Sequence, residues 1–182
     1  MIIIFCSCEV KAQEQAYLGL YADSSMTSSC ASHNLSFIEV FVMLRPIESG
    51  NTILDYKITS TNSNIIFHDG GSAILHHSNV CGGYYEVADP PTSCTWHIEL
   101  CNCFDPAYNP ERSGFLVVHV FNVLNYYYQG GDLIIEPSEN GLVAYGCDNQ
   151  TTYPLLPYQN FTIEAPIATD QSSWGAIKSM YR

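Results

Sequence analysis

The sequence predicts an all-β protein, an antiparallel β-sandwich of about nine strands with a short C-terminal helix. Residues 114–124 read Gly-Phe-Leu-Val-Val-His-Val-Phe-Asn-Val-Leu, which is typical of a central strand covered on both faces. We expect Val118, Val120 and Val123 of this strand to belong to the core. About eight shorter segments alternate apolar and polar residues with a period of two. No segment keeps a helical period beyond two or three turns, so β-structure dominates the prediction.

Composition predicts a single acidic domain. A chain of 182 residues with 47% hydrophobic residues can bury one good core, which we place at residues 16–165. The formal charge of -12 repels phosphate backbones and anionic lipid surfaces. We therefore expect no nucleic-acid partner and no membrane insertion once an export signal has been removed.

The first half of the domain contains three clear strands. Residues 16–22 predict a first strand at a sheet edge, and the apolar run 35–44 predicts a buried one. Residues 52–60 alternate most cleanly, with Leu54, Tyr56 and Ile58 on one face. Asp55, Lys57 and Thr59 occupy the other face, which indicates a half-exposed strand.

The second half continues the pattern of short strands and turns. Residues 65–67 and 72–75 predict two strands joined by a tight turn, and the Gly- and Pro-rich residues 81–93 predict a loop. Strands then follow at residues 95–101, 114–124, 132–136, 142–145 and 160–165. Asn140-Gly141, between two apolar runs, is the strongest hairpin signal in the chain.

Cysteine positions indicate export. Cys6 and Cys8 lie in residues 1–12, a short apolar run followed by small residues that we interpret as a truncated signal peptide. Six cysteines remain, an even number that favours disulfides in an exported chain: Cys30, Cys81, Cys94, Cys101, Cys103 and Cys147. Fifteen connectivities stay open. A bridge between Cys81 and Cys94 would staple the loop between them.

The same region offers an alternative to disulfides. Cys94, His97, Cys101 and Cys103 are spaced so that thiolates and an imidazole could converge on one zinc ion. The paired CxxC knuckles of structural zinc sites are missing, and an exported chain oxidises such thiols. We therefore expect disulfides, with no metal and no cofactor.

Three of these strands also carry a family resemblance. Residues 37–42 (Phe-Ile-Glu-Val-Phe-Val), 53–58 (Ile-Leu-Asp-Tyr-Lys-Ile) and 114–124 follow one another in an order that resembles cohesin-like and related immunoglobulin-like sandwich modules of secreted bacterial proteins. The likeness covers roughly residues 16–146 and implies a β-sandwich that binds another protein. The chain departs from cohesin modules in its cysteine content.

The C-terminal residues have their own pattern. Residues 166–182 predict a linker and a short helical tail whose ending, Trp-Gly-Ala-Ile-Lys-Ser-Met-Tyr-Arg, resembles the termini of uncharacterised secreted proteins of uncultured bacteria. Such a tail implies a sorting or attachment signal. Its candidate residues are Trp174, Gly175, Lys178, Tyr181 and Arg182.

Tyrosines are the remaining candidates for binding. Tyr84 and Tyr85, with Tyr126, Tyr127 and Tyr128, lie in predicted loops, where flat amphipathic rings suit a sugar or a protein surface. There is no Gly-x-Ser-x-Gly elbow and no acidic pair in a recognisable frame, so we expect no enzyme. The sequence predicts a secreted or cell-surface structural and protein-interaction module, with a carbohydrate-binding module as the alternative.

Overall fold

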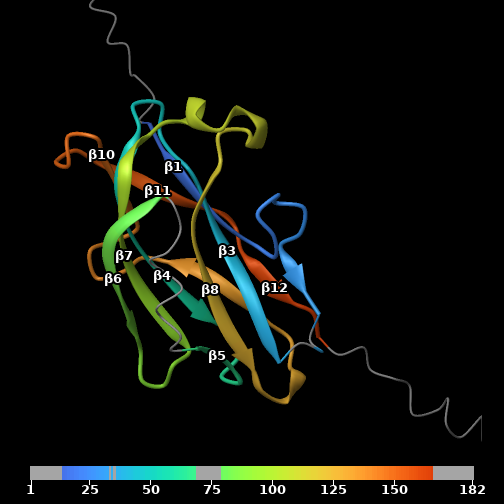
Figure 1. Cartoon of the computed structure of the whole chain (residues 1–182). Helices are drawn as coiled ribbons and strands as arrows, with labels where there is room; N and C mark the ends of the chain where they lie inside the picture. Colours follow the sequence, from blue (N-terminus) through green and yellow to red (C-terminus); the bar gives the residue numbers. More distant parts are fainter. Residues whose placement is uncertain (1–13, 33, 35, 69–78, 166–182) are drawn as a thin grey trace, which may run out of the picture.

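The computed structural model describes residues 14–165 except positions 33, 35 and 69–78. These residues form the two packed layers of a β-sandwich (Figure 1), which confirms the predicted fold class. The strands are β1 (Ala16–Tyr21), β2 (Cys30–Ala31), β3 (Phe37–Arg45), β4 (Asn51–Ser60), β5 (Ile65–Phe67), β6 (Val80–Val87), β7 (Ser93–Phe104), β8 (Leu116–Asn125), β9 (Gly131–Glu136), β10 (Val143–Gly146), β11 (Thr152–Gln159) and β12 (Phe161–Ile163). Short 3-10 helices are η2 (Pro106–Tyr108), η3 (Pro110–Arg112) and η4 (Tyr126–Tyr128).

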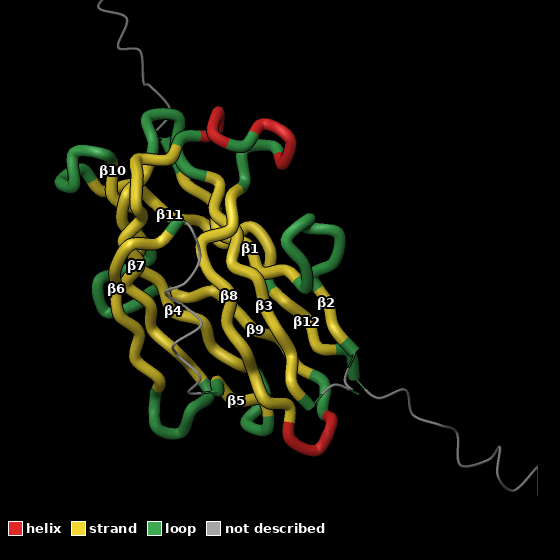
Figure 2. The backbone as a smooth tube through the Cα atoms, viewed as in Figure 1, coloured by secondary structure: helices red, strands yellow, loops and turns green. Residues whose placement is uncertain are grey.

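The first layer has the order β11-β1-β3-β8-β5. Strand β8 pairs along the whole of β3, as expected for the longest apolar run in the chain. Strand β1 lies between β3 and β11, pairing antiparallel with the first and parallel with the second, so the expectation of an edge strand is wrong. Strand β11 also pairs with β10 and thereby joins the two layers along one side (Figure 2).

The second layer is built around β4. One side of β4 pairs with β7, whose other side carries the edge strand β6. Residues 80–87 are therefore a strand and not the loop predicted from their Gly and Pro content. Gly82 and Gly83 permit this pairing, because a Cβ on Gly83 (φ 124°) would collide with the backbone oxygen of His97.

The Asn140-Gly141 turn does not close a hairpin. Ser138 and Gly141 exchange backbone hydrogen bonds, but the strands on either side of the turn do not pair with each other. Strand β9 pairs with residues 57–60 of β4, and β10 pairs with residues 51–55 of the same edge. The turn therefore connects two strands that pair, one after the other, with the same edge of β4.

The core between the layers is aromatic. Trp96 is almost fully buried, and its ring makes edge contacts with Tyr56, Phe67 and Phe121. The Tyr56 hydroxyl lies 2.8 Å from Nε2 of His119, which is also fully buried. Burial raises the pKa of the Tyr56 hydroxyl well above its ordinary value, so this hydroxyl stays protonated inside the sandwich.

A bulge in β8 decides which of its valines enter the core. Val42 pairs with His119 while Met43 pairs with Val117, which leaves Val118 as an extra residue. Val118 and Val123 lie in the core, as the sequence predicts. Val120 does not: it is partly buried on the outer side of the layer. The expectation that Val120 is a core residue is wrong because the bulge reverses the side-chain alternation.

The outer side of the first layer holds a second apolar cluster, which we call the Met43 face. Its buried members are Tyr21, Met43, Phe115 and Val117. Tyr17, Met26, Phe41 and Val120 pack around them and are partly buried. The central strands are therefore covered on both faces, as the continuous apolar runs predict.

Two disulfides tie the second layer. Cys81–Cys101 joins β6 to β7, and Cys103–Cys147 joins the end of β7 to the residue after β10. The proposed Cys81–Cys94 bridge is wrong because the side chain of Cys94 points into the core.

Cys30 and Cys94, both predicted to be bridged, lie outside the two disulfides. Cys30 lies on β2, which is separated from β7 by β12, β9 and β4. Four strand spacings of about 4.8 Å exceed the Cα separation of about 7 Å that a disulfide can span. A bridge between these two cysteines would therefore need a different sheet order.

Several sequence-based expectations lie outside the described residues. These are the export signal at residues 1–12, the strand at residues 72–75, and the tail with Trp174, Gly175, Lys178, Tyr181 and Arg182. Among the helices that the structure does describe, none has the length and apolar character needed to cross a membrane.

Candidate interaction face

The outer side of the second layer carries polar and aromatic side chains from four paired strands. Leu54, Tyr56, Trp96 and Ile98 point into the core, so alternate residues of β4 and β7 point outward. Strand pairing aligns these outward residues with those of β6 and β10. We call this surface the Asp55 face: Ile53, Asp55, Tyr84, Glu86, Thr95, His97, Glu99, Val143 and Tyr145.

His97 lies at the centre of the Asp55 face and contacts three neighbours. Its Nδ1 lies 2.7 Å from Oδ1 of Asp55, the residue opposite it on β4. Its Nε2 lies 3.8 Å from Oε1 of Glu99. Its ring stacks on Tyr84, the residue opposite it on β6, at a centroid distance of 5.0 Å. Three strands thus fix the orientation of one imidazole.

Asp55 is a carboxylate in an unusually closed position. The residue is only 2% exposed; its Oδ1 lies beside Nδ1 of His97, and the Tyr145 hydroxyl interacts with the same carboxylate. Burial raises the pKa of the Tyr145 hydroxyl, and the charge of Asp55 raises it further. A buried carboxylate that lost one of these partners would be destabilised by about 1–3 kcal/mol, so both contacts hold the centre of the face in place.

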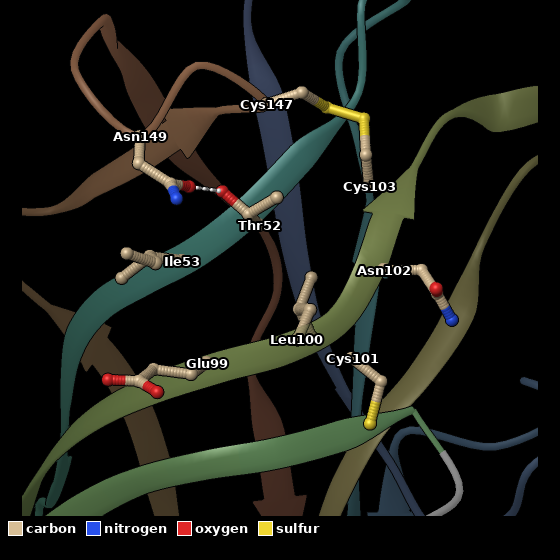
Figure 3. Close-up of a pocket in the computed structure, with 9 residues that line it drawn as sticks. All are labelled: Thr52, Ile53, Glu99, Leu100, Cys101, Asn102, Cys103, Cys147 and Asn149. Carbon is tan, nitrogen blue, oxygen red and sulfur yellow. Dashed lines mark hydrogen bonds between the residues drawn. A yellow bond between two sulfur atoms is a disulfide. The ribbon is translucent and has the colours of Figure 1, made fainter.

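Two hollows flank this centre. The smaller, of about 140 Å³, lies beneath the turn of residues 138–141 and is lined by Asp55, Tyr84, Glu86, Thr95, His97, Ser138, Glu139 and Asn140. The larger, of about 510 Å³, extends from Glu99 to the Cys103–Cys147 disulfide (Figure 3). The Asn149 side chain accepts a hydrogen bond from the Thr52 hydroxyl at its rim.

The charge of the Asp55 face is negative. Asp55, Glu86 and Glu99 contribute carboxylates, and Glu139 adds one from the turn beside the face. Lys57, opposite Thr95, is the one Lys or Arg in β4, β6, β7 and β10. Acceptors beside an exposed aromatic ring suit a donor-rich, positively charged surface on a partner.

The five predicted tyrosines do not form one site. Tyr84 belongs to the Asp55 face and is 58% exposed. Tyr85, one residue on, points inward and its ring makes an edge contact with Trp96. Tyr126, Tyr127 and Tyr128 form η4 after β8, at a separate place on the surface.

The residues of the zinc alternative are also separated. Cys94 faces the core while His97 bonds Asp55 on the opposite side of β7. Cys101 and Cys103 belong to two different disulfides. In the part of the chain that the structure describes, no three His, Cys, Asp or Glu side chains gather in a way that could hold a metal ion.

Sequence reasoning missed the central pair. Asp55 and His97 were both assigned to outward faces of their strands, but nothing in the sequence sets the register between β4 and β7. The signal that could have found them is a carboxylate and an imidazole at outward positions of two cleanly alternating strands, which pair when those strands are neighbours.

No protein-family model matches the chain, and no curated protein is detectably similar to it in sequence. Solved structures are similar in fold. The seventh ScaB type I cohesin from Pseudobacteroides cellulosolvens matches with a TM-score of 0.51 at 11% identity, over 87% of this chain and 96% of that chain. The non-cellulosomal cohesin from the archaeon Archaeoglobus fulgidus matches with a TM-score of 0.50 at 12% identity, over 90% and 98%.

A third match describes a complex. The third ScaC cohesin of Acetivibrio cellulolyticus, solved with the ScaB dockerin, has a TM-score of 0.51 at 13% identity, over 85% of this chain and 99% of that chain. Each similar cohesin is matched over nearly its whole length. The chain described here therefore has a cohesin-like β-sandwich fold.

Proposed function

We propose that this chain is a secreted or cell-surface protein-interaction module without catalytic activity, and that its partner docks on the Asp55 face. The observation that carries the proposal is the buried Asp55 carboxylate, held by His97 beneath an exposed tyrosine on an open sheet. Cohesins with the same fold have been solved in complex with dockerins, which supports a protein partner.

The chemistry of the face narrows the kind of partner. Carboxylates outnumber cations there, so a partner that presents Arg or Lys gains complementary charge. A guanidinium or ammonium group that entered the smaller hollow would lie beside the Tyr84 ring and the carboxylates of Glu86 and Glu139. The rigid Tyr84–His97 stack presents its ring at little entropic cost.

The arrangement of the Asp55–His97 pair supports a non-catalytic role. A nucleophile would have to lie within hydrogen-bond reach of the free ring nitrogen of the histidine. Nε2 of His97 instead faces Glu99, and the Ser138 hydroxyl in the same hollow donates to the backbone oxygen of Gly141. The pair positions Tyr84 and supplies acceptors.

Export and attachment are part of the same proposal. Two disulfides are typical of extracellular chains. The tail residues Trp174, Gly175, Lys178, Tyr181 and Arg182 are proposed to form a sorting or attachment signal, and residues 1–12 the end of an export signal. Deletion of residues 170–182 should leave the melting temperature within a few degrees while changing where the protein is found. A large loss of stability with unchanged localisation would reject the tail proposal.

Binding measurements with face variants test the proposed function. The full chain is titrated by calorimetry with a panel of dockerin modules, chosen to include basic recognition surfaces. Tyr84→Ala and Glu99→Ala should each weaken the tightest interaction at least tenfold, about 1.4 kcal/mol. Tyr158→Ala is the matched control, because Tyr158 is 59% exposed and lies on β11, outside the face. If Tyr84→Ala and Glu99→Ala bind as tightly as Tyr158→Ala, the Asp55 face is not the binding surface.

A further inference from the structure

A second surface lies outside the Asp55 face. Tyr126, Tyr127 and Tyr128, which we call the tyrosine turn, form η4 at the end of β8 (Figure 2). Their exposed fractions are 49%, 78% and 52%, and the structure describes no aromatic partner for any of the three rings. Three consecutive and largely exposed aromatic rings form a surface patch of the kind that marks interaction sites.

The backbone of the tyrosine turn is strained. Tyr127 and Tyr128 both have a left-handed conformation, with φ values of 63° and 53°. Glycine adopts this conformation without the Cβ clash that a tyrosine incurs, and a turn would ordinarily carry glycine here. Two tyrosines thus occupy backbone positions at which glycine would be less strained. Strained residues of this kind cluster at functional sites.

The turn is nevertheless firmly held. The side chain of Asn125 bonds both backbone groups of Gln129, accepting from its N–H and donating to its oxygen at 3.0 Å each. The side chain of Asn62 donates to the oxygen of Gly130, and the Tyr126 N–H donates to the oxygen of Asn64. The backbone that carries the rings is therefore held in one conformation, which lowers the entropic cost of binding.

The tyrosine turn itself and the two stretches that hold it carry no charged side chain. Residues 120–131 contain no Asp, Glu, Lys, Arg or His, and neither does the adjoining stretch 61–64, although the chain has eighteen acidic residues. Hydroxyl and amide groups accompany the rings instead. The nearest charges are the carboxylates of Asp132 and Glu164, which would repel an anionic ligand, whereas a neutral ligand with flat C–H faces and many hydroxyls would find stacking surfaces and hydrogen-bond partners.

From this combination we infer that the tyrosine turn is a binding platform for neutral polysaccharide, separate from the Asp55 face. Pyranose rings stack on the exposed tyrosines, and the phenol and amide groups bond the sugar hydroxyls. The module thus holds a protein partner through one surface and a neutral glycan through another. This inference stands or falls independently of the proposed protein partner.

Affinity electrophoresis in native gels tests it. The full chain is run in gels that contain hydroxyethylcellulose, xyloglucan or galactomannan, with polygalacturonate as an acidic comparison. We expect retardation by at least one neutral polymer and none by the acidic one. If no neutral polymer retards the chain, or if polygalacturonate does so as strongly, the inference is overturned.

Tyr127→Gly is the decisive variant, because glycine relieves the left-handed strain while removing the most exposed ring. It should keep or raise the melting temperature and weaken polysaccharide binding at least fivefold. Tyr158→Ala and Tyr84→Ala are the controls, since each removes an exposed tyrosine elsewhere and should bind as the unaltered chain does. Unchanged binding by Tyr127→Gly, or an equal loss in both controls, contradicts the platform.

Discussion

The outer faces of the two layers differ in polarity and in solvent exposure. On the Met43 face, Met43 is completely buried, and Tyr21, Phe115 and Val117 are less than one-tenth exposed. On the Asp55 face, Tyr84 and Glu99 are open to solvent around a single buried carboxylate. The first face is apolar and closed by the chain itself, whereas the second is polar, aromatic and open. This difference fits the proposal that the first face serves stability and the second serves recognition.

The largest expected effect distinguishes the core from the Met43 face. Val118→Asp places an unpaired charge in the core, which costs several kcal/mol against a total stability of about 5–15, so the variant should not fold. Val120→Asp lies two residues away on the partly buried Met43 face and should fold with a loss of about 1–2 kcal/mol. Urea unfolding measures both. A cooperatively folded Val118→Asp would show that the bulge in β8 is misplaced.

The next effect compares the two outer faces directly. Met43→Ala removes a fully buried side chain and should cost about 2–5 kcal/mol in the free energy of unfolding. Ile53→Ala on the Asp55 face removes a partly exposed side chain and should cost less than about 1 kcal/mol. Equal losses in thermal or urea melts would contradict the division between a closed and an open face.

A smaller effect concerns the centre of the Asp55 face. His97→Ala leaves Asp55 without its donor at Oδ1 and should cost about 1–2 kcal/mol, the lower part of the usual range because His97 is partly exposed to water. Thr95→Ala, on the same strand and face, is the matched control and should stay within about 0.5 kcal/mol. If His97→Ala leaves the free energy of unfolding unchanged, the hydrogen bond from His97 to Asp55 does not stabilise the fold.

The smallest effect is a loss of stability at acidic pH that arises from Asp23. This residue lies in the turn that places Met26 against the Met43 face. Bonds from the Thr27 hydroxyl first, and then from Ser25 and backbone groups, lower the pKa of Asp23 to about 2. A folded-state pKa below the ordinary value of about 3.9 stabilises the fold above pH 4, and this stabilisation is lost as the pH falls from about 4 to 2. The melting-temperature difference between the unaltered chain and Asp23→Asn should shrink over that interval. A constant difference would contradict the assignment.

Much of the fold could be predicted from local pattern. The run at residues 114–124 and the alternation at residues 52–60 identified β8 and β4, because burial on two faces or one leaves a direct trace in sequence. Strand β6 was missed because Gly82 and Gly83, which normally break strands, are required for close approach to β7. Residues 152–159 were not assigned to a strand because Pro154 and Pro157 argue against one, yet β11 forms there.

The candidate site could be predicted only in part. Tyr84 was identified, but its contact with His97 depends on the register between β6 and β7, which local sequence does not determine. The disulfide pairs depend on sheet order in the same way, since Cys81 and Cys101 meet across two neighbouring strands. The tyrosine turn was identified as a group, but its left-handed backbone carries no signal in a run of three identical residues.

Site-specific photo-crosslinking tests the central claim most directly. A benzophenone side chain is placed at Glu86 on the Asp55 face, or at Phe41 on the Met43 face, in the full chain displayed by its own host. The account predicts one discrete crosslinked protein from position 86, lost when Tyr84→Ala is added, and none from position 41. Crosslinks from position 41, or from position 86 regardless of Tyr84, would contradict the claim that the Asp55 face binds the partner.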